Sequence, residues 1–341
     1  MTDLAADPEI TTGTDGGTRR ERRERAPLLA LRDAAGMVEA RVTTGDGGPR
    51  SPSRLDGVDL EIQPRETMAV LGEAASGDVA LARLTLGLRP LARGSRWWRD
   101  RDVTDPTSAA ARAARLRIQP VFHDPVTALN PQLRIVDAIG DAPVGERIIA
   151  VAQKPEYVAL HLNRVGIDPM SMRRYPQQFA AGQRMRIAIA RALAVRPELL
   201  VWDDAFALLD VTERAQLLNL ALDLRSALEL TYLLVSRDPA IVAHASDRVT
   251  VLYRGRIVES GRTRDVLGAP AHPYTRTLLG ASPDAQQRAA PTEAVATPAG
   301  SHGCAFRLRC PHVLPECSTI APVLVAIAPG RRAACHLHRP A

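Results

Sequence analysis

This sequence of 341 residues is poor in aromatic residues and in lysine, has no cysteine before residue 304, and contains no long apolar run. Its apolar stretches are far shorter than the ~18 residues that a membrane-spanning helix needs. The first residues, MTDLAADPEITTGTDGG, are polar and acidic, whereas a signal peptide needs an apolar core. We therefore expect an intracellular protein that reaches a membrane only through partners.

The scarcity of lysine bears on nucleic-acid binding. Lys154 is the only lysine, so arginine carries the net charge of +6. Part of that arginine lies in RRERRER, from Arg19 to Arg25, where glutamates interrupt the basic run. Such a pattern is typical of a solvated tail. We expect no nucleic-acid partner, and salt-dependent binding would test that remote alternative.

Cysteine is confined to the C-terminal end, where the spacing is C-x5-C-x6-C-x17-C. An intracellular chain with four cysteines in one short segment favours a metal over disulfides. Four thiolates can ligate an iron–sulfur cluster or a tetrahedral zinc ion. Histidines nearby make a mixed Cys/His zinc site an alternative, and free thiols are another. The residues concerned are Cys304, Cys310, Cys317 and Cys335, with His302, His312, His336 and His338.

Turn residues and alternation divide the first half of the chain. Residues 1–27 are predicted to form a disordered Arg-rich tail, and residues 45–54 a turn-rich loop. The stretch GVDLEIQPRETMAVLG (57–72) predicts a strand, a turn at a proline, and a buried strand that ends at a glycine. A helix is expected at 79–88. The proline-punctuated segment 117–131 is expected to be a loop.

The second half alternates between helices and strands. Residues 134–165 are expected to be mostly helical. Residues 181–204 predict a helix, a turn at Arg196-Pro197, and a buried strand that runs into two aspartates. An amphipathic helix at 215–230 precedes the strand TYLLVS, and residues 248–261 predict a strand pair that turns at Gly255. This order predicts a mostly parallel α/β sheet.

Five stretches in order resemble the ATP-binding subunit of an ABC transporter, of the oligopeptide/dipeptide importer branch. They are GEAASGDVA, VFHDPVTALNP, YPQQFAAGQRMRIAIARALAVRPELLVWDDAFALLD, LLVSRDP and HPYTRTLLGA. The resemblance covers roughly residues 28–341. It implies a nucleotide-binding domain at 28–262, with a RecA-like core, an antiparallel β subdomain and a helical subdomain at about 121–189. A Cys-rich extension, 263–341, would follow.

The first stretch is similar to a phosphate-binding P-loop, but it departs from the family pattern. A P-loop has the pattern G-x-x-x-x-G-K-[ST], in which the lysine reaches the phosphates and the hydroxyl binds Mg²⁺. Here Asp78 replaces the lysine, Val79 the hydroxyl, and Ala75 a family glycine. The positions are Gly72, Glu73, Ala74, Ala75, Ser76, Gly77, Asp78 and Val79. An alternative interpretation is a plain strand-to-helix turn with Asp78 as an N-terminal helix charge.

Inversion of the charge at Asp78 has a large expected cost. A pair of unit charges at about 4 Å is worth about 4 kcal/mol at an effective dielectric of 20. We therefore expect the affinity for a triphosphate to fall on the order of a thousandfold. No aromatic residue precedes Trp97, so the usual adenine-stacking residue is missing as well.

The other catalytic positions of the family also differ. The resemblance matches Asp203 to the Mg²⁺-linked aspartate, and Asp204 stands where the family has the catalytic glutamate. His123 replaces the loop glutamine, and Arg237 replaces the switch histidine. Arg237 is expected either to bind an anion or to form a surface salt bridge with the adjacent Asp238.

The signature motif, which in this family contacts the nucleotide of the facing subunit, is partly retained. Family members read Leu-Ser-Gly-Gly-Gln, and this chain reads Phe179-Ala180-Ala181-Gly182-Gln183. Ala180 lacks the hydroxyl that would touch a γ-phosphate. Gly182 and the helix N-terminus behind it remain, and such a terminus attracts anions. Leu209-Asp210 keeps the end of the dimer-contact loop.

The resemblance therefore implies a catalytically degenerate cassette subunit of a peptide import complex. It would pair with an ATPase-competent sister subunit and dock on two permease subunits at the cytoplasmic face of the membrane, served indirectly by a solute-binding protein. ATP and Mg²⁺ are the family cofactors, with binding in this chain's own site doubtful. The resemblance also favours a [4Fe–4S] cluster over zinc in the tail. The rival interpretations are a working ATPase with unusual loops and a non-transport metal- or redox-sensing protein.

Overall fold

The computed structural model describes residues 26–38, 53–124, 128–280 and 303–338. The tail predicted at 1–27 lies outside these residues, apart from Ala26 and Pro27. Most of the loop predicted at 45–54 lies outside them too, and His302 also does. No helix of the described part of the chain is long and apolar enough to cross a bilayer.

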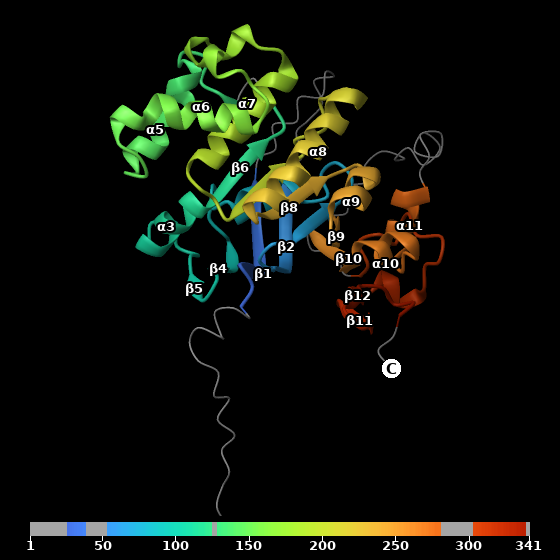
Figure 1. The fold of residues 1–341 in the computed structure, drawn as a ribbon. Helices are drawn as coiled ribbons and strands as arrows, with labels where there is room; N and C mark the ends of the chain where they lie inside the picture. The colour runs from blue at the N-terminus through green and yellow to red at the C-terminus, as the bar shows by residue number, and fades with distance from the viewer. Residues whose placement is uncertain (1–25, 39–52, 125–127, 281–302, 339–341) are drawn as a thin grey trace, which may run out of the picture.

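An eight-stranded sheet runs through the centre of the molecule (Figure 1). Its order is β11-β12-β10-β9-β3-β8-β7-β6, in which β9 to β6 are parallel and β10, β12 and β11 continue it antiparallel. The strands are β3 (Thr67–Leu71), β6 (Ile118–Phe122), β7 (Leu199–Asp203), β8 (Thr231–Ser236), β9 (Arg248–Tyr253), β10 (Arg256–Arg262), β11 (Val325–Ala328) and β12 (Arg331–Ala333).

The expected strands at β3, β7, β8 and the β9–β10 pair are confirmed, and so is the mostly parallel α/β core. The expected loop at 117–131 is wrong in its first part, because residues 118–122 form β6. This strand is the last of the sheet, and no described strand pairs with its outer side. Edge strands tolerate proline, so Pro120 is compatible with the strand.

Both faces of the central strands are buried, which explains their nearly continuous apolar sequences. Alternate residues enter two different cores. In β7, Leu199 and Val201 face one core, whereas Leu200 and Trp202 face the other. Strands β3 and β8 divide their side chains in the same way. Because successive side chains of a strand point to opposite faces, each central strand contributes to the cores on both faces of the sheet.

A second, four-stranded antiparallel sheet covers one of these cores. Its order is β2-β1-β4-β5. The strands are β1 (Leu29–Val38), β2 (Ser53–Ile62), β4 (Arg93–Trp98) and β5 (Arg101–Asp102). Leu29, Leu31, Leu55 and Ile62 are fully buried and pack in the same core as helix α2 (Asp78–Thr85). The antiparallel sheet therefore packs against α2, the helix that follows the β3–α2 loop.

The remaining helices cover the other core, except α3, whose Ala111 and Ala114 belong to the core beneath the antiparallel sheet. Helices α5, α6 and α7 form a separate lobe, and α8 and α9 lie against the central sheet (Figure 1). The helices predicted at 79–88, 134–165, 181–195 and 215–230 are confirmed, with shifted ends. Their bounds are α3 (Ala109–Arg117), α5 (Ile135–Gly145), α6 (Lys154–Arg164), α7 (Ala181–Ala194), α8 (Val211–Leu228), α9 (Pro239–Ala245), α10 (Thr263–Gly268) and α11 (Pro273–Gly280).

The C-terminal segment 303–338 is joined to the sheet. Strand β12 pairs with β10, and β11 pairs with β12. The fully buried Glu259 of β10 holds this junction, because its carboxylate accepts hydrogen bonds from the Ala271 and His272 amides and an ion pair from Arg331 at 2.8 Å. Cys304, Phe306 and Cys317 belong to the same core as the central strands.

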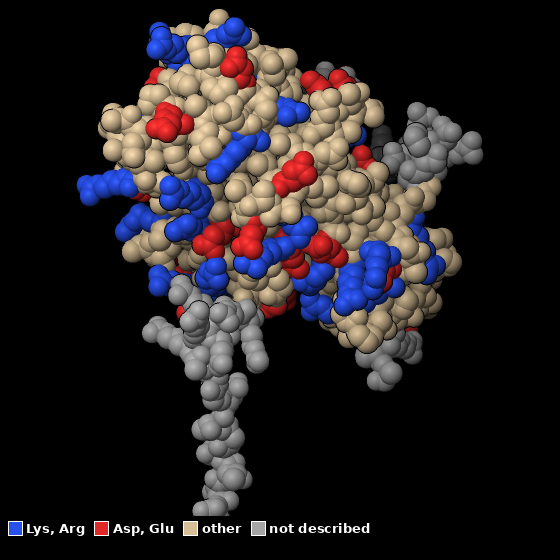
Figure 2. Space-filling model, viewed as in Figure 1, with Lys and Arg blue, Asp and Glu red and all other residues tan. Residues whose placement is uncertain are grey.

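Charged side chains of both signs are intermixed on the face shown in Figure 2. Arginine and acidic residues lie close together below the helical lobe. On this face the basic excess is therefore not collected into one basic patch.

Candidate functional site

The loop between β3 and α2 folds into a tight cradle that requires its glycines. Gly77 has φ +111°, and a Cβ there would lie 2.7 Å from the Arg54 carbonyl oxygen. At Gly72, a Cβ would lie 2.5 Å from Ser76 Oγ. Ala75 has φ 63°, a conformation that glycine adopts more readily. Ala75 therefore adopts a left-handed backbone conformation at a position where the family resemblance expects glycine.

Asp78 stands at the start of α2 and is buried. Its residue is only 2% exposed, and its Oδ2 accepts a hydrogen bond from Arg237 Nε at 3.2 Å. Its Oδ1 has no partner among the described residues. A buried carboxylate without a cation is costly, so Arg237 stabilises Asp78 in this position.

Arg237 also bridges to Asp204. Arg237 Nε lies 3.7 Å from Asp204 Oδ2, so one guanidinium faces two carboxylates. The expected salt bridge between Arg237 and Asp238 is not what forms. Asp238 instead caps α9 by accepting the Ala240 amide and pairs with Arg214 at 3.2 Å. Arg237 follows the last residue of β8 and faces the P-loop, because both lie at the carboxyl edge of the parallel strands.

Asp203 and Asp204 end β7 beside the cradle. Burial raises the pKa of Asp203 to about 6, with His123 and Arg83 opposing the shift and Asp78 adding to it. Burial also raises the pKa of Asp204, which Arg237 partly offsets. Asp203 Oδ1 has no hydrogen-bond partner in the described chain. The structure thus gathers five predicted residues in one place: Asp78, His123, Asp203, Asp204 and Arg237.

The predicted signature residues lie elsewhere. They precede and open α7, where the Ala180 amide donates to Gln183 Oε1 at 3.1 Å. Ala180, Gly182, Gln183 and Leu209 line a separate cavity of about 120 Å³, which the P-loop residues do not line. Phe179 is buried in the core, and Ala181 is the first residue of α7. Asp210 caps α8 by accepting the Glu213 amide.

Two residues that the sequence did not single out hold the P-loop from the C-terminal side. The Glu73 amide donates to the Tyr274 hydroxyl at 2.9 Å. The Glu73 carboxylate accepts two hydrogen bonds from Arg309, at 2.8 and 2.9 Å. Tyr274 belongs to the HPYT stretch, whose only signal in the sequence is its resemblance to the importer branch. Nothing in the local sequence marks Arg309, because the contact depends on how the tail folds back.

Comparison with known proteins agrees with this geometry. The family model for the ABC transporter matches residues 55–207, and the model for the oligopeptide/dipeptide transporter C-terminal region matches residues 258–317. The chain belongs to the ABC transporter family. A protein of Brucella abortus (strain 2308) named as a peptide import ATP-binding protein is 39% identical over 299 residues, covering 86% of this chain and 89% of its own.

Another ABC relative, named as a peptide ABC transporter ATP-binding protein, comes from Sinorhizobium fredii. It is 36% identical over 84% of this chain and 83% of its own length. Among solved structures, cbiO1 from Clostridium perfringens matches with TM-score 0.61 and 21% identity, covering 72% of this chain and 92% of that one. The ATP-binding cassette MJ0796 bound to ADP and Pi matches with TM-score 0.60 and 19% identity, over 70% and 99%. These likenesses confirm the ABC fold.

The four cysteines of this ABC chain lie within one small module. Cys304 and Cys317 are buried, and the Cys304 amide donates to the Cys317 carbonyl at 2.8 Å. Burial raises the pKa of the Cys304 and Cys335 thiols, and Cys310 and Cys317 add to the shift at both. No group of three or more His, Cys, Asp or Glu in the described chain is arranged to hold a metal. The thiol donors fit a metal in kind, but the side chains of the described residues are not arranged to hold one.

Proposed function

We propose that this ABC protein is the ATP-binding-cassette subunit of a peptide importer, and that its own ATP site is catalytically degenerate. The names of the relatives and the match to the oligopeptide/dipeptide C-terminal region support the transport role. In this role the chain would lie at the cytoplasmic face of the membrane, on two permease subunits. A solute-binding protein would deliver the cargo from the other side.

The ion pair between Asp78 and Arg237 is the observation that carries the degenerate assignment. In a working P-loop a lysine offers its charge to the nucleotide phosphates. Here a buried carboxylate takes that position, and the arginine that could offset it is engaged by two carboxylates. The one cation facing the site is therefore already engaged, and an entering triphosphate would have to displace Arg237 and approach Asp78, Asp203 and Asp204.

The signature side supports a role toward a partner. Gly182 and Gln183 open α7 beside a cavity, and a Cβ at Gly182 would lie 2.7 Å from Glu213 Oε1. This face would offer backbone amides to the nucleotide of a sister ATP-binding subunit. We propose that residues 121–180, including the His123 loop, receive the permeases. The role of the chain would then be to close the dimer and transmit its motion.

Two measurements on the purified chain test the degenerate assignment. Calorimetric titration with MgATP should show no binding, or binding only at millimolar nucleotide. A phosphate-release assay should show no activity above background. ATP hydrolysis that disappears in Asp204→Asn would overturn the assignment. Co-purification with permeases and a second cassette subunit tests the transport role separately.

We further propose that the four cysteines take up a metal, as a [4Fe–4S] cluster or zinc, after their side chains rearrange. The His312 amide already donates to Cys310 Sγ at 3.4 Å, and such hydrogen bonds stabilise metal-bound sulfur. Iron, sulfide and zinc analysis of anaerobically purified protein, compared with Cys317→Ser, decides between the metals. Metal-free protein with unchanged stability in Cys317→Ser would contradict this proposal.

A further inference from the structure

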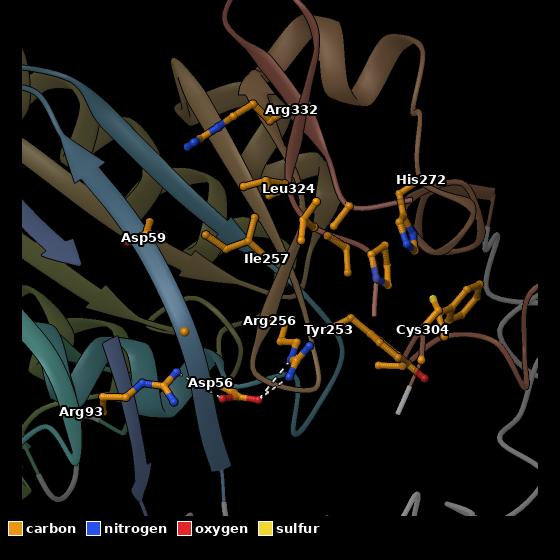
Figure 3. A pocket seen from close by; sticks show the side chains of 18 residues that line it. Asp56, Asp59, Arg93, Tyr253, Arg256, Ile257, His272, Cys304, Leu324 and Arg332 are labelled. Atoms are coloured by element: carbon orange, nitrogen blue, oxygen red, sulfur yellow. Dashed lines mark hydrogen bonds and ion pairs between the residues drawn. The ribbon is translucent and has the colours of Figure 1, made fainter. Parts of the chain in front are cut away.

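A cavity of about 410 Å³ lies where three parts of the chain meet: β2, the β9–β10 pair, and segment 303–338 (Figure 3). It is separate from the predicted nucleotide residues, none of which lines it. Its volume falls within the range of roughly 300–1,000 Å³ that small-molecule sites occupy. The cavity is therefore large enough for a small organic ligand.

One side of this cavity is apolar. Tyr253, Ile257 and Phe306 are at most 8% exposed, and Leu324 lies beside them. Figure 3 shows the Ile257 side chain pointing from β10 toward β2. Val323, which is 73% exposed, stands at the rim. A ligand with an apolar side chain would cover this wall and gain from the removal of its surface from water.

The charged groups of the cavity are unevenly paired. Asp56 accepts two hydrogen bonds from Arg256 and lies 3.7 Å from Arg93, so these three are mutually satisfied. Asp59 accepts only the Asp33 amide and has no cationic partner in the described chain. The Arg332 guanidinium has no hydrogen-bond or ion-pair partner among the described residues either, although its backbone belongs to strand β12. Two exposed residues, Asp59 of β2 and Arg332 of β12, thus line the cavity with charges that have no oppositely charged partner in the described chain.

A buried histidine adds a neutral donor. His272 is 1% exposed and lines the cavity, and its Nδ1 accepts the Tyr274 amide at 3.0 Å. With Nδ1 as acceptor, the ring proton lies on Nε2. No partner for Nε2 occurs among the described residues. This nitrogen is therefore available to donate a hydrogen bond to a carbonyl group.

We propose that the cavity binds a small zwitterion with an apolar side chain, namely a free apolar amino acid or a dipeptide. Asp59 pairs with the ammonium group, Arg332 with the carboxylate, and the apolar side chain lies against Ile257 and Leu324. The ligand class follows from the cavity's own residues and holds whether or not the chain hydrolyses ATP. Neither the family assignment nor the predicted nucleotide site requires it.

The position of the cavity links an occupant to the P-loop. Tyr253 and Phe306 line the cavity, and the Arg309 guanidinium lies 6.0 and 5.5 Å from their ring centroids. Arg309 in turn holds Glu73. A ligand that orders Tyr253 and Phe306 therefore also orders Arg309. Binding should slow amide hydrogen exchange at residues 72–77.

Calorimetric titration of the full chain with four probes tests the proposal. The probes are leucine, Leu-Leu, N-acetyl-Leu-Leu and Leu-Leu-amide. We expect leucine or Leu-Leu to bind. The one that binds shows which separation between the ligand's ammonium and carboxylate groups fits Asp59 and Arg332. Each blocked dipeptide should bind at least tenfold more weakly than Leu-Leu, because it loses one charge-assisted contact. No binding of either zwitterion, or equal binding of the blocked forms, overturns the proposal.

Single variants assign the two ends of the ligand. Arg332→Gln should weaken zwitterion binding about tenfold and abolish the preference for a free carboxylate. Asp59→Asn should do the same for the ammonium group. Arg264→Gln is the matched control, because Arg264 is 77% exposed, pairs with its neighbour Asp265 and lies outside the cavity. Variants that melt like the wild type yet bind unchanged would contradict these roles.

Discussion

Arg237 and Asp78 are 159 positions apart in the sequence, yet Arg237 Nε lies 3.2 Å from Asp78 Oδ2. The family resemblance places a lysine at one of these positions and a histidine at the other. The chain instead carries an acid and a base in contact. The two departures are therefore coupled, because the partly exposed Arg237 offsets the charge of the buried Asp78 carboxylate.

Restoring the family residues at both positions should restore nucleotide binding. Asp78→Lys alone would set a lysine against Arg237, so we expect little gain. The double variant Asp78→Lys with Arg237→His removes that repulsion and should raise MgATP affinity at least tenfold, because the reversed charge is worth on the order of several kcal/mol. Isothermal titration checks this, with the exposed Asp223→Lys as control. An equal gain in the control would show a non-specific charge effect.

Asp203 makes the protein more stable at lower pH, within a limited range. Its pKa is about 6 in the folded protein against 3.8 for an ordinary aspartate, so the folded state takes up a proton first as the pH falls. The stability that this group contributes therefore increases as the pH falls from 6 to 4, and it is lost as the pH rises through 6. A shift of about two pKa units corresponds to on the order of 3 kcal/mol.

Urea unfolding of Asp203→Asn and wild type measures this contribution. The variant should be more stable at pH 7, and the gap should close toward pH 4. The difference between the proteins is the readout, because His272 acts in the opposite direction: burial lowers its pKa to about 4, so its contribution is lost as the pH falls below 6.5. A gap that does not change with pH would contradict the assignment.

The strain at Gly77 predicts a large effect of a small substitution. Gly77→Ala must adopt φ +111° and bring a Cβ within 2.7 Å of the Arg54 carbonyl oxygen. We expect a loss of about 2 kcal/mol or more in the free energy of unfolding. Gly145→Ala is the matched control, since a Cβ there meets nothing within 4 Å. Equal stability of the two variants would show that the cradle is not shaped as described.

The hold of the C-terminal module on the P-loop can be measured through Arg309. Arg309→Gln removes a bidentate ion pair with Glu73. Because the pair is partly exposed, we expect the free energy of unfolding to fall by about 1 kcal/mol. Hydrogen exchange should rise both at residues 72–77 and at residues 303–338. Glu73→Gln should give the same pattern, and the double variant should add little. Fully additive effects would mean that the two residues act independently.

The sequence predicted the central strands because their apolar residues alternate between two cores, as in β7. It missed β6, since Pro120 is typical of a loop and only the sheet order shows that this strand lies at an edge. The candidate nucleotide residues were predicted from their resemblance to the family's motifs, because no local hydrophobic or turn pattern marks them. The sequence could not pair Arg237 with Asp78 and Asp204, because adjacency in the sequence favoured Asp238. The contact from Arg309 to Glu73 and the cavity beside β2 arise only when the C-terminal segment folds back onto β10.

The packing of the C-terminal segment against β10 has a consequence for synthesis on the ribosome. Glu73 and Arg309 are 236 positions apart, so at about 5–20 residues per second the ribosome makes the second roughly ten to fifty seconds after the first. From the time it is made until residues 331–333 follow, β10 lacks the β12 neighbour that covers its outer side. An uncovered strand edge invites pairing with other chains. Nascent chains stalled before residue 303 should therefore depend on chaperones, and completion of the tail should end that dependence.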